Sequence, residues 1–376
     1  MIIRPLPRQE PARAGLPRIG PIFIHIFSLS HSMTTRADTD PSPACSPDSL
    51  ECDGVLRLTH WGVIRARGAD ATKFLQGQLT NDFGLLGLSQ ARLAGYCSPK
   101  GRMLASFVGF KLAHDDVLLA CHRDLLPTTL KRLSMFVMRA QCKLSDATDV
   151  FDVYGLAGST ADQWASTVQL GPATWDKAAL PAATASTEST PGTDTPPGAL
   201  VRLPSAGAGA QATTRLLACV PAAASLPPPL STTQPALGAA QWDWLEVQSG
   251  VAMVGLPLVE AFVPQMLNYE SVGGVNFKKG CYPGQEVVAR SQYRGTLKRR
   301  TYRVAADAPL SVGQDVFHSS DAEQPCGTVV AASSIGNAAL VSMQTSAAES
   351  GTLTAGSPAG AALHLQTLPY ALLADI

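Results

Sequence analysis

Apolar and polar positions follow two different periods from residue 54 onward, as expected of a globular chain. Apolar residues three to four positions apart predict a helix, whereas strict alternation predicts a strand. The helical period occurs over residues 71–78, where Phe74 and Leu79 belong to an apolar stripe, and again over 125–136. Short segments with the strand pattern lie at residues 55–58, 62–66, 92–97, 103–110, 116–120 and 150–156.

The middle of the chain loses this regularity. Residues 171–240 are rich in Ala, Pro, Ser and Thr, and the stretches 182–197 and 225–235 are of low complexity, which favours mobile loops. Between these two stretches, strands are expected only at 199–203 and 214–220. A helix is predicted over 242–250, and its two tryptophans are expected to pack in the core, the alternative being contact with a ligand.

The C-terminal part contains several short alternating segments separated by Gly and Ser turns. They lie at residues 302–304, 313–317, 327–330 and 338–341. Regular short strands of this kind predict a small β-barrel. Before them, Gln285–Tyr293 has the length of two helical turns, with Pro283 suited to its first turn and Gly295 as its stop.

The N-terminus is rich in arginine and poor in acids. Residues 1–36 hold five arginines and a single acid, Glu10, a bias that occurs in mitochondrial transit peptides. Prolines at positions 5, 7, 11, 17 and 21 disfavour the amphipathic helix that such a peptide needs. The favoured interpretation is therefore a disordered leader over 1–50 of a cytoplasmic protein, with Met1 or Met33 as its start. The alternative location, if the protein is eukaryotic, is the mitochondrial matrix.

The overall charge gives no electrostatic case for nucleic acid, because 29 basic and 29 acidic residues cancel. Charge is nevertheless uneven, since residues 278–303 hold eight basic side chains and one acid, Glu286. Such a local field attracts polyanions. The alternative is an ordinary solvated basic surface, but the run adjoins the Cys281 motif, which favours a ligand role. No apolar run reaches the roughly 20 residues that a membrane-spanning helix needs.

Eight cysteines are scattered along the chain without a CxxC pair or a Cys/His cluster of zinc-finger spacing. The pattern favours a reducing compartment with mostly structural thiols, and it predicts no metal site. Cys281 differs, because it lies between Gly280 and Gly284, beside two lysines and just before the predicted helix. Nearby cations and a helix N-terminus lower a thiol pKa. The alternative is an inert cysteine in a tight turn, and the complete motif favours the reactive interpretation.

The motif Phe277-Lys278-Lys279-Gly280-Cys281-Tyr282-Pro283-Gly284-Gln285-Glu286 resembles the signature of the YgfZ-type folate-binding proteins, relatives of the glycine-cleavage T-protein (aminomethyltransferase). The likeness extends over further segments in the expected order, at residues 74–82, 96–102, 262–268, 293–295 and 298–300. The resemblance implies a three-part α+β fold around a central folate site, with a small C-terminal β-barrel. The boundaries we expect are a leader over 1–50, α+β domains over 51–150 and 151–298, and the barrel over 299–376.

The resemblance also implies a tetrahydrofolate cofactor held near the motif. The predicted cofactor-binding residues are Lys279, Gly280, Tyr282, Gly284, Gln285, Glu286 and Arg290, beside Cys281 as the reactive residue. Lys279 and Arg290 suit the carboxylates of folate. Glu286 can accept hydrogen bonds from the pterin or form an ion pair with Arg290, and Tyr282 can stack or simply pack.

One departure from the T-protein pattern concerns its catalytic acids. The aspartate pair that the T-protein places after a glycine-rich turn falls here on Ala105 and Ser106. Neither can act as a carboxylate base, which argues against T-protein catalysis. Asn81 and Asp82 keep the polar type of the family; they are expected to cap a turn, and a ligand role is the alternative.

The leading hypothesis that the resemblance supplies is an accessory factor for iron–sulfur cluster assembly or repair. It would work with bound tetrahydrofolate, the iron–sulfur assembly machinery and client iron–sulfur enzymes, and Cys281 would be its reactive or transiently ligating thiol. Effects on tRNA modification would be indirect, without direct nucleic-acid contact. The alternatives are a folate-dependent aminomethyl or one-carbon transferase and a non-catalytic folate-binding module.

Overall fold

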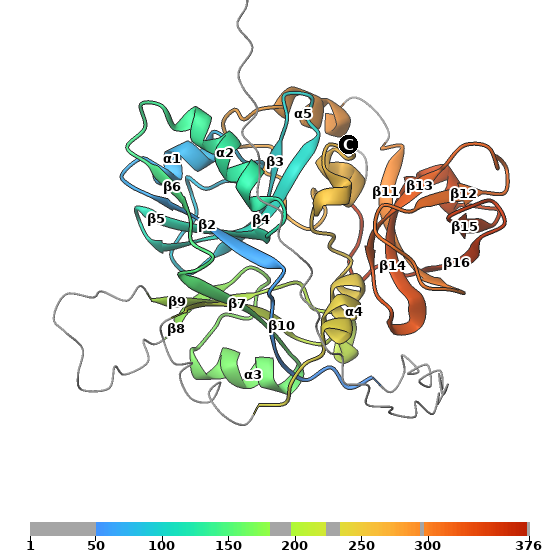
Figure 1. Ribbon diagram of the computed structural model, residues 1–376, viewed down its shortest axis with the longest axis horizontal. Coiled ribbons are helices and arrows are strands. Elements are labelled where there is room, and N and C mark those ends of the chain that lie inside the picture. The colour runs from blue at the N-terminus through green and yellow to red at the C-terminus, as the bar shows by residue number, and fades with distance from the viewer. Residues whose placement is uncertain (1–49, 181–196, 223–233, 294–296, 374–376) are drawn as a thin grey trace, which may run out of the picture. The chain divides into compact units, whose positions relative to one another are not determined.

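The computed structural model describes residues 50–180, 197–222, 234–293 and 297–373 (Figure 1). The predicted leader, the choice between Met1 and Met33, almost all of both low-complexity stretches, and the stop at Gly295 lie outside the described residues. The predicted α+β fold with a C-terminal barrel is confirmed, because two antiparallel five-stranded sheets with helices are followed by a closed barrel of six strands.

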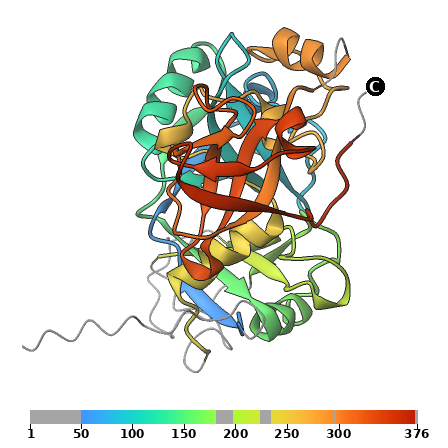
Figure 2. The ribbon, with the colours of Figure 1, turned by 90° about the vertical axis from the view of Figure 1, so that its right-hand side faces the viewer.

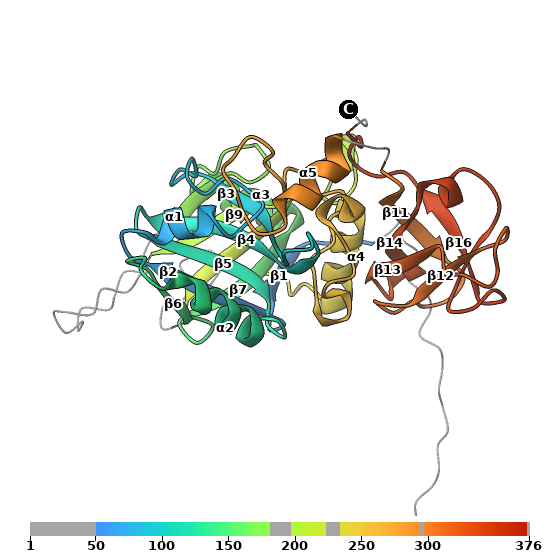
Figure 3. The same ribbon diagram turned by 90° about the horizontal axis from the view of Figure 1, so that it is seen from above.

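The first sheet has the strand order β3-β4-β5-β2-β6. Its strands are β2 (Trp61–Arg67), β3 (Ala91–Cys97), β4 (Met103–Ala113), β5 (Asp116–His122) and β6 (Lys143–Asp146). The helices predicted over 71–78 and 125–136 are present as α1 (Ala71–Gln76) and α2 (Leu126–Val137), and α2 lies along this sheet near β6 (Figure 3). Its apolar stripe explains this position, because Leu126 and Leu133 are fully buried.

The second sheet has the order β1-β7-β10-β9-β8. It contains β1 (Gly54–Arg57), β7 (Phe151–Ala157), β8 (Lys177–Leu180), β9 (Gly198–Arg202) and β10 (Arg215–Pro221), with helices α3 (Gly158–Thr167) and α4 (Ala239–Ser249). Strand β1 precedes the whole first sheet in the sequence but pairs with β7. The sequence did not predict α3, whose apolar stripe is limited to Ala161, Trp164 and Ala165.

The closed barrel follows the order β11-β14-β13-β12-β15-β16. Figure 2 shows the barrel from the side that faces the viewer. Its strands are β11 (Arg299–Ala306), β12 (Asp315–His318), β13 (Gly327–Ala332), β14 (Ala338–Gln344), β15 (Leu353–Ala355) and β16 (Ala361–Gln366). Closure leaves the barrel without a free edge, and its own core includes Val304, Val341 and Met343.

The segment between α4 and the barrel is mostly irregular and is held by polar side chains. It contains the short 3-10 helices η3 (Leu256–Leu258) and η4 (Pro264–Leu267) and the helix α5 (Gln285–Tyr293), which has the predicted bounds. Asn268, with φ of 58°, donates from Nδ2 to Thr301 O at 2.7 Å and accepts from Thr301 N at 3.1 Å. Glu270 forms a buried ion pair with Arg300 at 2.7 Å. These bonds attach the first barrel strand to this segment.

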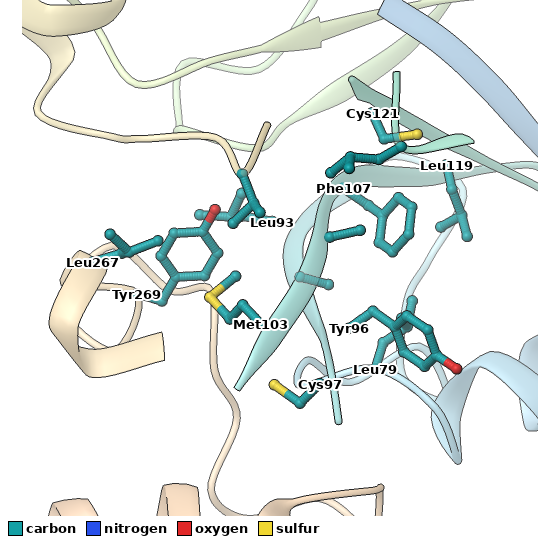
Figure 4. Close-up of a cluster of buried hydrophobic side chains, with 14 of the residues drawn as sticks. Leu79, Leu93, Tyr96, Cys97, Met103, Phe107, Leu119, Cys121, Leu267 and Tyr269 are labelled. Atoms are coloured by element: carbon teal, nitrogen blue, oxygen red, sulfur yellow. The ribbon is translucent and has the colours of Figure 1, made fainter. Parts of the chain in front are cut away.

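The main hydrophobic core combines the first sheet with the later segment. Leu267 and Tyr269 pack with Met103 and other side chains of this sheet (Figure 4). Cys97 and Cys121 lie in the same core, where burial raises the pKa of each thiol to about 12. Both are structural thiols, as expected from the scattered cysteine pattern.

Candidate functional site

The site is built where the motif before α5 meets the turn between β3 and β4. Gly284 has φ of 80°, and a Cβ added to it would lie 2.4 Å from Ser98 O and 2.7 Å from Gly101 Cα. Gly101 has φ of 71°, and its own added Cβ would lie 2.8 Å from Val287 Cβ. Two glycines from distant parts of the sequence therefore let two backbones pack directly against each other. The turn fixes the start of α5 in this way.

Lys279 connects the motif to the end of α1. Its Nζ donates to Gln76 O at 2.5 Å and to Leu79 O at 2.8 Å, and it lies 4.6 Å from the centre of the Tyr282 ring. The side chain is buried, and this burial lowers its pKa to about 8. Two of its three donors are thus engaged inside the protein.

The polar residues after α1 hold the loop that leads into the motif. Thr80 Oγ1 donates to Gly274 O at 2.7 Å, and Asn81 Nδ2 donates to Gly273 O at 2.6 Å. Asp82 Oδ1 accepts a hydrogen bond from Leu85 N at 2.9 Å. Of the two interpretations of Asn81 and Asp82, these contacts correspond to the cap or turn.

Cys281 is the one exposed cysteine among those that the structure describes. The others are buried or half-buried: Cys52, Cys97, Cys121, Cys142, Cys219 and Cys326. A Cβ added to the preceding Gly280 would meet no atom within 4 Å, so the loop is open on that side. The thiol is therefore presented to solvent by a loop whose flanking residues are anchored.

The other predicted cofactor-binding residues divide between the interior and the surface. Tyr282 is buried and packs under Lys279, which corresponds to the packing interpretation; burial raises its pKa. Gln285 is half-buried, whereas Glu286 and Arg290 are exposed on α5. No ion pair joins Glu286 to Arg290 in the described part of the chain, so both charges face solvent.

Ala105 and Ser106 occupy core positions on β4. Ala105 is fully buried, and Ser106 Oγ accepts a hydrogen bond from Val254 N at 2.7 Å. No carboxylate belongs to either position, which agrees with the departure from the T-protein pattern. Within the described ranges, no three His, Cys, Asp or Glu side chains gather as a metal site, and no helix is long and apolar enough to cross a membrane.

Sequence reasoning missed one polar group near the helix α4. Arg215 is buried over the Trp242 ring at 4.6 Å and lies 3.8 Å from Glu246, and burial lowers its pKa to about 10. Trp242 Nε1 donates to Glu246 Oε1 at 3.1 Å. The signal was the four-residue spacing of Trp242 and Glu246, which places both side chains on one helix face. Asp243, beside them, has its pKa raised to about 6 by burial.

Comparison with known proteins gives relatives over most of the chain. No family model matches. A protein of Edwardsiella ictaluri (strain 93-146) named tRNA-modifying protein YgfZ is 29% identical over 326 residues, 80% of this chain and 86% of the relative. One of the same name from Sodalis glossinidius (strain morsitans) is 28% identical over 342 residues, 85% of this chain and 93% of the relative.

The fold was also compared with solved structures. The crystal structure of glycine cleavage system aminomethyltransferase T from Bartonella henselae matches with a TM-score of 0.62 and 14% identity, covering 85% of this chain and 87% of that one. This match shows the fold alone. The resemblance predicted from the motif is confirmed: the chain is a homologue of the proteins named YgfZ and has the fold of the glycine-cleavage T-protein.

Proposed function

We propose that this protein is a tetrahydrofolate-binding accessory factor for iron–sulfur cluster assembly or repair, in which Cys281 is the reactive or transiently ligating thiol. The observation that carries the proposal is the exposure of Cys281 on an anchored loop, while the other described cysteines are buried or half-buried. Lys279 and Gly284 hold the two sides of this loop. A thiol held in this way can reach a partner protein without movement of the core.

The ligand count favours a transient role for Cys281. Four thiolates usually hold a [4Fe–4S] cluster. Cys281 supplies one, and Cys97, the other cysteine of the matched segments, is buried. Any cluster or sulfur species bound by Cys281 would therefore need further ligands from its assembly partner or client enzyme, which suits transfer or protection.

The donor set on α5 fits the chemistry of folate. Glu286 offers a carboxylate that can accept hydrogen bonds from pterin nitrogens, and Arg290 offers a guanidinium for the glutamate tail. Both are exposed and unpaired with each other in the described part of the chain, and they lie four residues apart on the same face. Bound tetrahydrofolate would supply a reduced one-carbon carrier beside Cys281.

We propose that this protein affects tRNA modification only indirectly. Its relatives are called tRNA-modifying proteins. This chain has a formal net charge of zero, which gives no general attraction to nucleic acid. An accessory factor acts through client iron–sulfur enzymes, some of which modify tRNA. We place the protein in the cytoplasm, with the mitochondrial matrix as the alternative.

A folate-dependent aminomethyl or one-carbon transferase is the second candidate, because the fold is that of an aminomethyltransferase. It requires an acid near the folate, and positions 105 and 106 hold Ala and Ser. A non-catalytic folate-binding module, the third candidate, does not require Cys281. The three candidates therefore differ in what each expects from an amine substrate and from loss of the thiol.

Complementation of a strain that lacks this factor tests the proposal. The Cys281→Ser protein should bind tetrahydrofolate normally but fail to restore aconitase-type and tRNA-thiolation activities. Cys142→Ser, at a half-buried thiol, is the matched control and should restore both. Normal rescue by Cys281→Ser contradicts the proposal and favours the non-catalytic module. Turnover of an aminomethyl donor by the purified protein would instead establish the transferase.

A further inference from the structure

A cavity of about 750 Å³ lies between α5 and the barrel. The elements that surround it are η4, α5, β11, the end of β14 and the short helix η6 (Thr345–Ala348). Among the predicted cofactor-binding residues only Arg290 lines it, and Cys281 does not. The volume is within the roughly 300–1,000 Å³ usual for small-molecule sites.

The charge of the cavity is of one sign. Arg290, Lys298 and Arg299 line it, and none of the described lining residues is Asp or Glu. None of these three side chains has an ion pair or a side-chain hydrogen bond within the described residues. Like charges gathered in a concave site raise the local concentration of anions. Thr345 and Ser346 add hydroxyl groups at the same walls, whereas the Ser291 hydroxyl already donates to Val287 O at 2.9 Å.

Gln265 belongs to the cavity wall and is held from inside the protein. The residue is fully buried, and its Nε2 donates to Val288 O at 2.7 Å. Its Oε1, on the same amide, has no hydrogen-bond donor among the described residues.

The remaining wall is aliphatic. Val263, Met266, Val287 and Leu297 contribute to it. An apolar wall beside three cations suits a ligand with an apolar or aromatic body and several negative groups.

We propose that this cavity is a binding site for a small organic polyanion, separate from the exposed Cys281. Oligo-γ-glutamyl carboxylates and nucleotide phosphates share the required chemistry. Both present multiple negative charges that guanidinium and ammonium groups bind through charge-assisted hydrogen bonds. The proposal does not depend on which of the two sources supplies the ligand.

Titration calorimetry on the full chain with four probes tests the proposal. ADP supplies phosphates, pteroyltriglutamate supplies multiple carboxylates, and adenosine and pteroylmonoglutamate are their counterparts with fewer charges. ADP should bind more tightly than adenosine, or the triglutamate more tightly than the monoglutamate, and the stronger of the two pairs identifies the source. Raising the salt concentration should weaken the preferred probe.

The variant Lys298→Gln/Arg299→Gln should weaken the preferred probe by roughly tenfold or more, since two charged contacts are lost. Lys131→Gln/Arg139→Gln removes the same two charge types from exposed positions near α2 and should leave affinity unchanged. If the double variant does not fold, Lys298→Gln alone, at an exposed residue, should give a smaller loss.

Two results would overturn the proposal: no charged probe binds better than its counterpart, or the cavity variant binds it as well as the control does. Arg290 is left intact because it also belongs to the proposed folate site. Unchanged pteroylmonoglutamate binding alongside a failed cavity test would therefore leave the proposed function standing.

Discussion

The two ends of helix α5 are built by different means. At the N-terminal end, Gly284 packs against Ser98 and Gly101 by backbone contact, and the buried Lys279 binds two carbonyls. Toward the C-terminal end, Arg290 is exposed and lines a cavity of about 750 Å³. Close packing of backbone atoms therefore holds the N-terminal end of α5, whereas the C-terminal end contributes a positive charge to the cavity.

This difference shows that the signature motif contains residues of two kinds. Lys279, Tyr282 and Gly284 contact the protein itself, and they hold the loop. Cys281 and Glu286 are exposed and available to a partner or ligand. A motif read only as a list of ligand contacts would miss that several of its members position the others.

The largest expected effect is from Gly284→Ala. A Cβ at this position would lie 2.4 Å from Ser98 O in a backbone with φ of 80°. Left-handed strain and the clash should together lower the free energy of unfolding by about 3 kcal/mol. Urea unfolding measures the loss. Gly280→Ala is the matched control, because its Cβ would meet nothing within 4 Å, and equal losses in the two variants would contradict the backbone contact.

Lys279→Met should have the next largest effect. It removes the donor to Gln76 O and Leu79 O, which would leave one part-buried and one buried carbonyl without this partner. We expect a loss of about 2 kcal/mol in the free energy of unfolding at pH 7. Lys278→Met, at the exposed neighbour, should change it by less than about 0.5 kcal/mol. A Lys279→Met protein as stable as the control would exclude this anchoring role.

The pH dependence of stability sharpens the same comparison. The pKa of Lys279 is lowered from 10.5 to about 8 in the folded protein. Between these values the unfolded chain binds more protons at this residue, so the contribution of Lys279 to the free energy of unfolding rises with pH. The stability difference between wild type and Lys279→Met should therefore increase from pH 8 to pH 10. A constant difference across this range would show that the lysine pKa is not lowered.

Thiol labelling separates the two cysteines of the motif segments without unfolding the protein. Iodoacetamide should modify Cys281 in the folded state, because that thiol is exposed. Cys97 should react only after unfolding, since its thiol is buried and its pKa is raised to about 12. Peptide mass spectrometry measures both, and urea-unfolded protein is the control. Comparable labelling of Cys97 in the folded protein would contradict the packing of this core.

The smallest effect on stability is expected at the other end of the helix. Arg290 is exposed and makes no ion pair within the described residues. Arg290→Gln should change the free energy of unfolding by less than about 0.5 kcal/mol. The same urea experiment measures it, and a large loss would mean that this end also holds the fold.

The hydrophobic periodicity predicted most elements of this fold, because the amphipathic pattern of a helix or strand depends only on residues close together in the sequence. The helices α2 and α5 and the small barrel are examples. It failed to predict α3, where the sequence is mostly polar and Trp164 is the one large apolar side chain that is buried. It also gave no sign that β1 pairs with β7 across about a hundred residues, since strand partners depend on the whole sheet.

The sequence by itself determined the family resemblance, the unusual Cys281 and the basic run after it, because each depends on residue types in order. Only the tertiary structure decided that Lys279 is anchored inside while Cys281 is exposed. It also decided that Arg290, Lys298 and Arg299 share one cavity. The physical reason is that burial and charge proximity arise from contacts between segments distant in sequence, such as the turn at Gly101 and the start of α5.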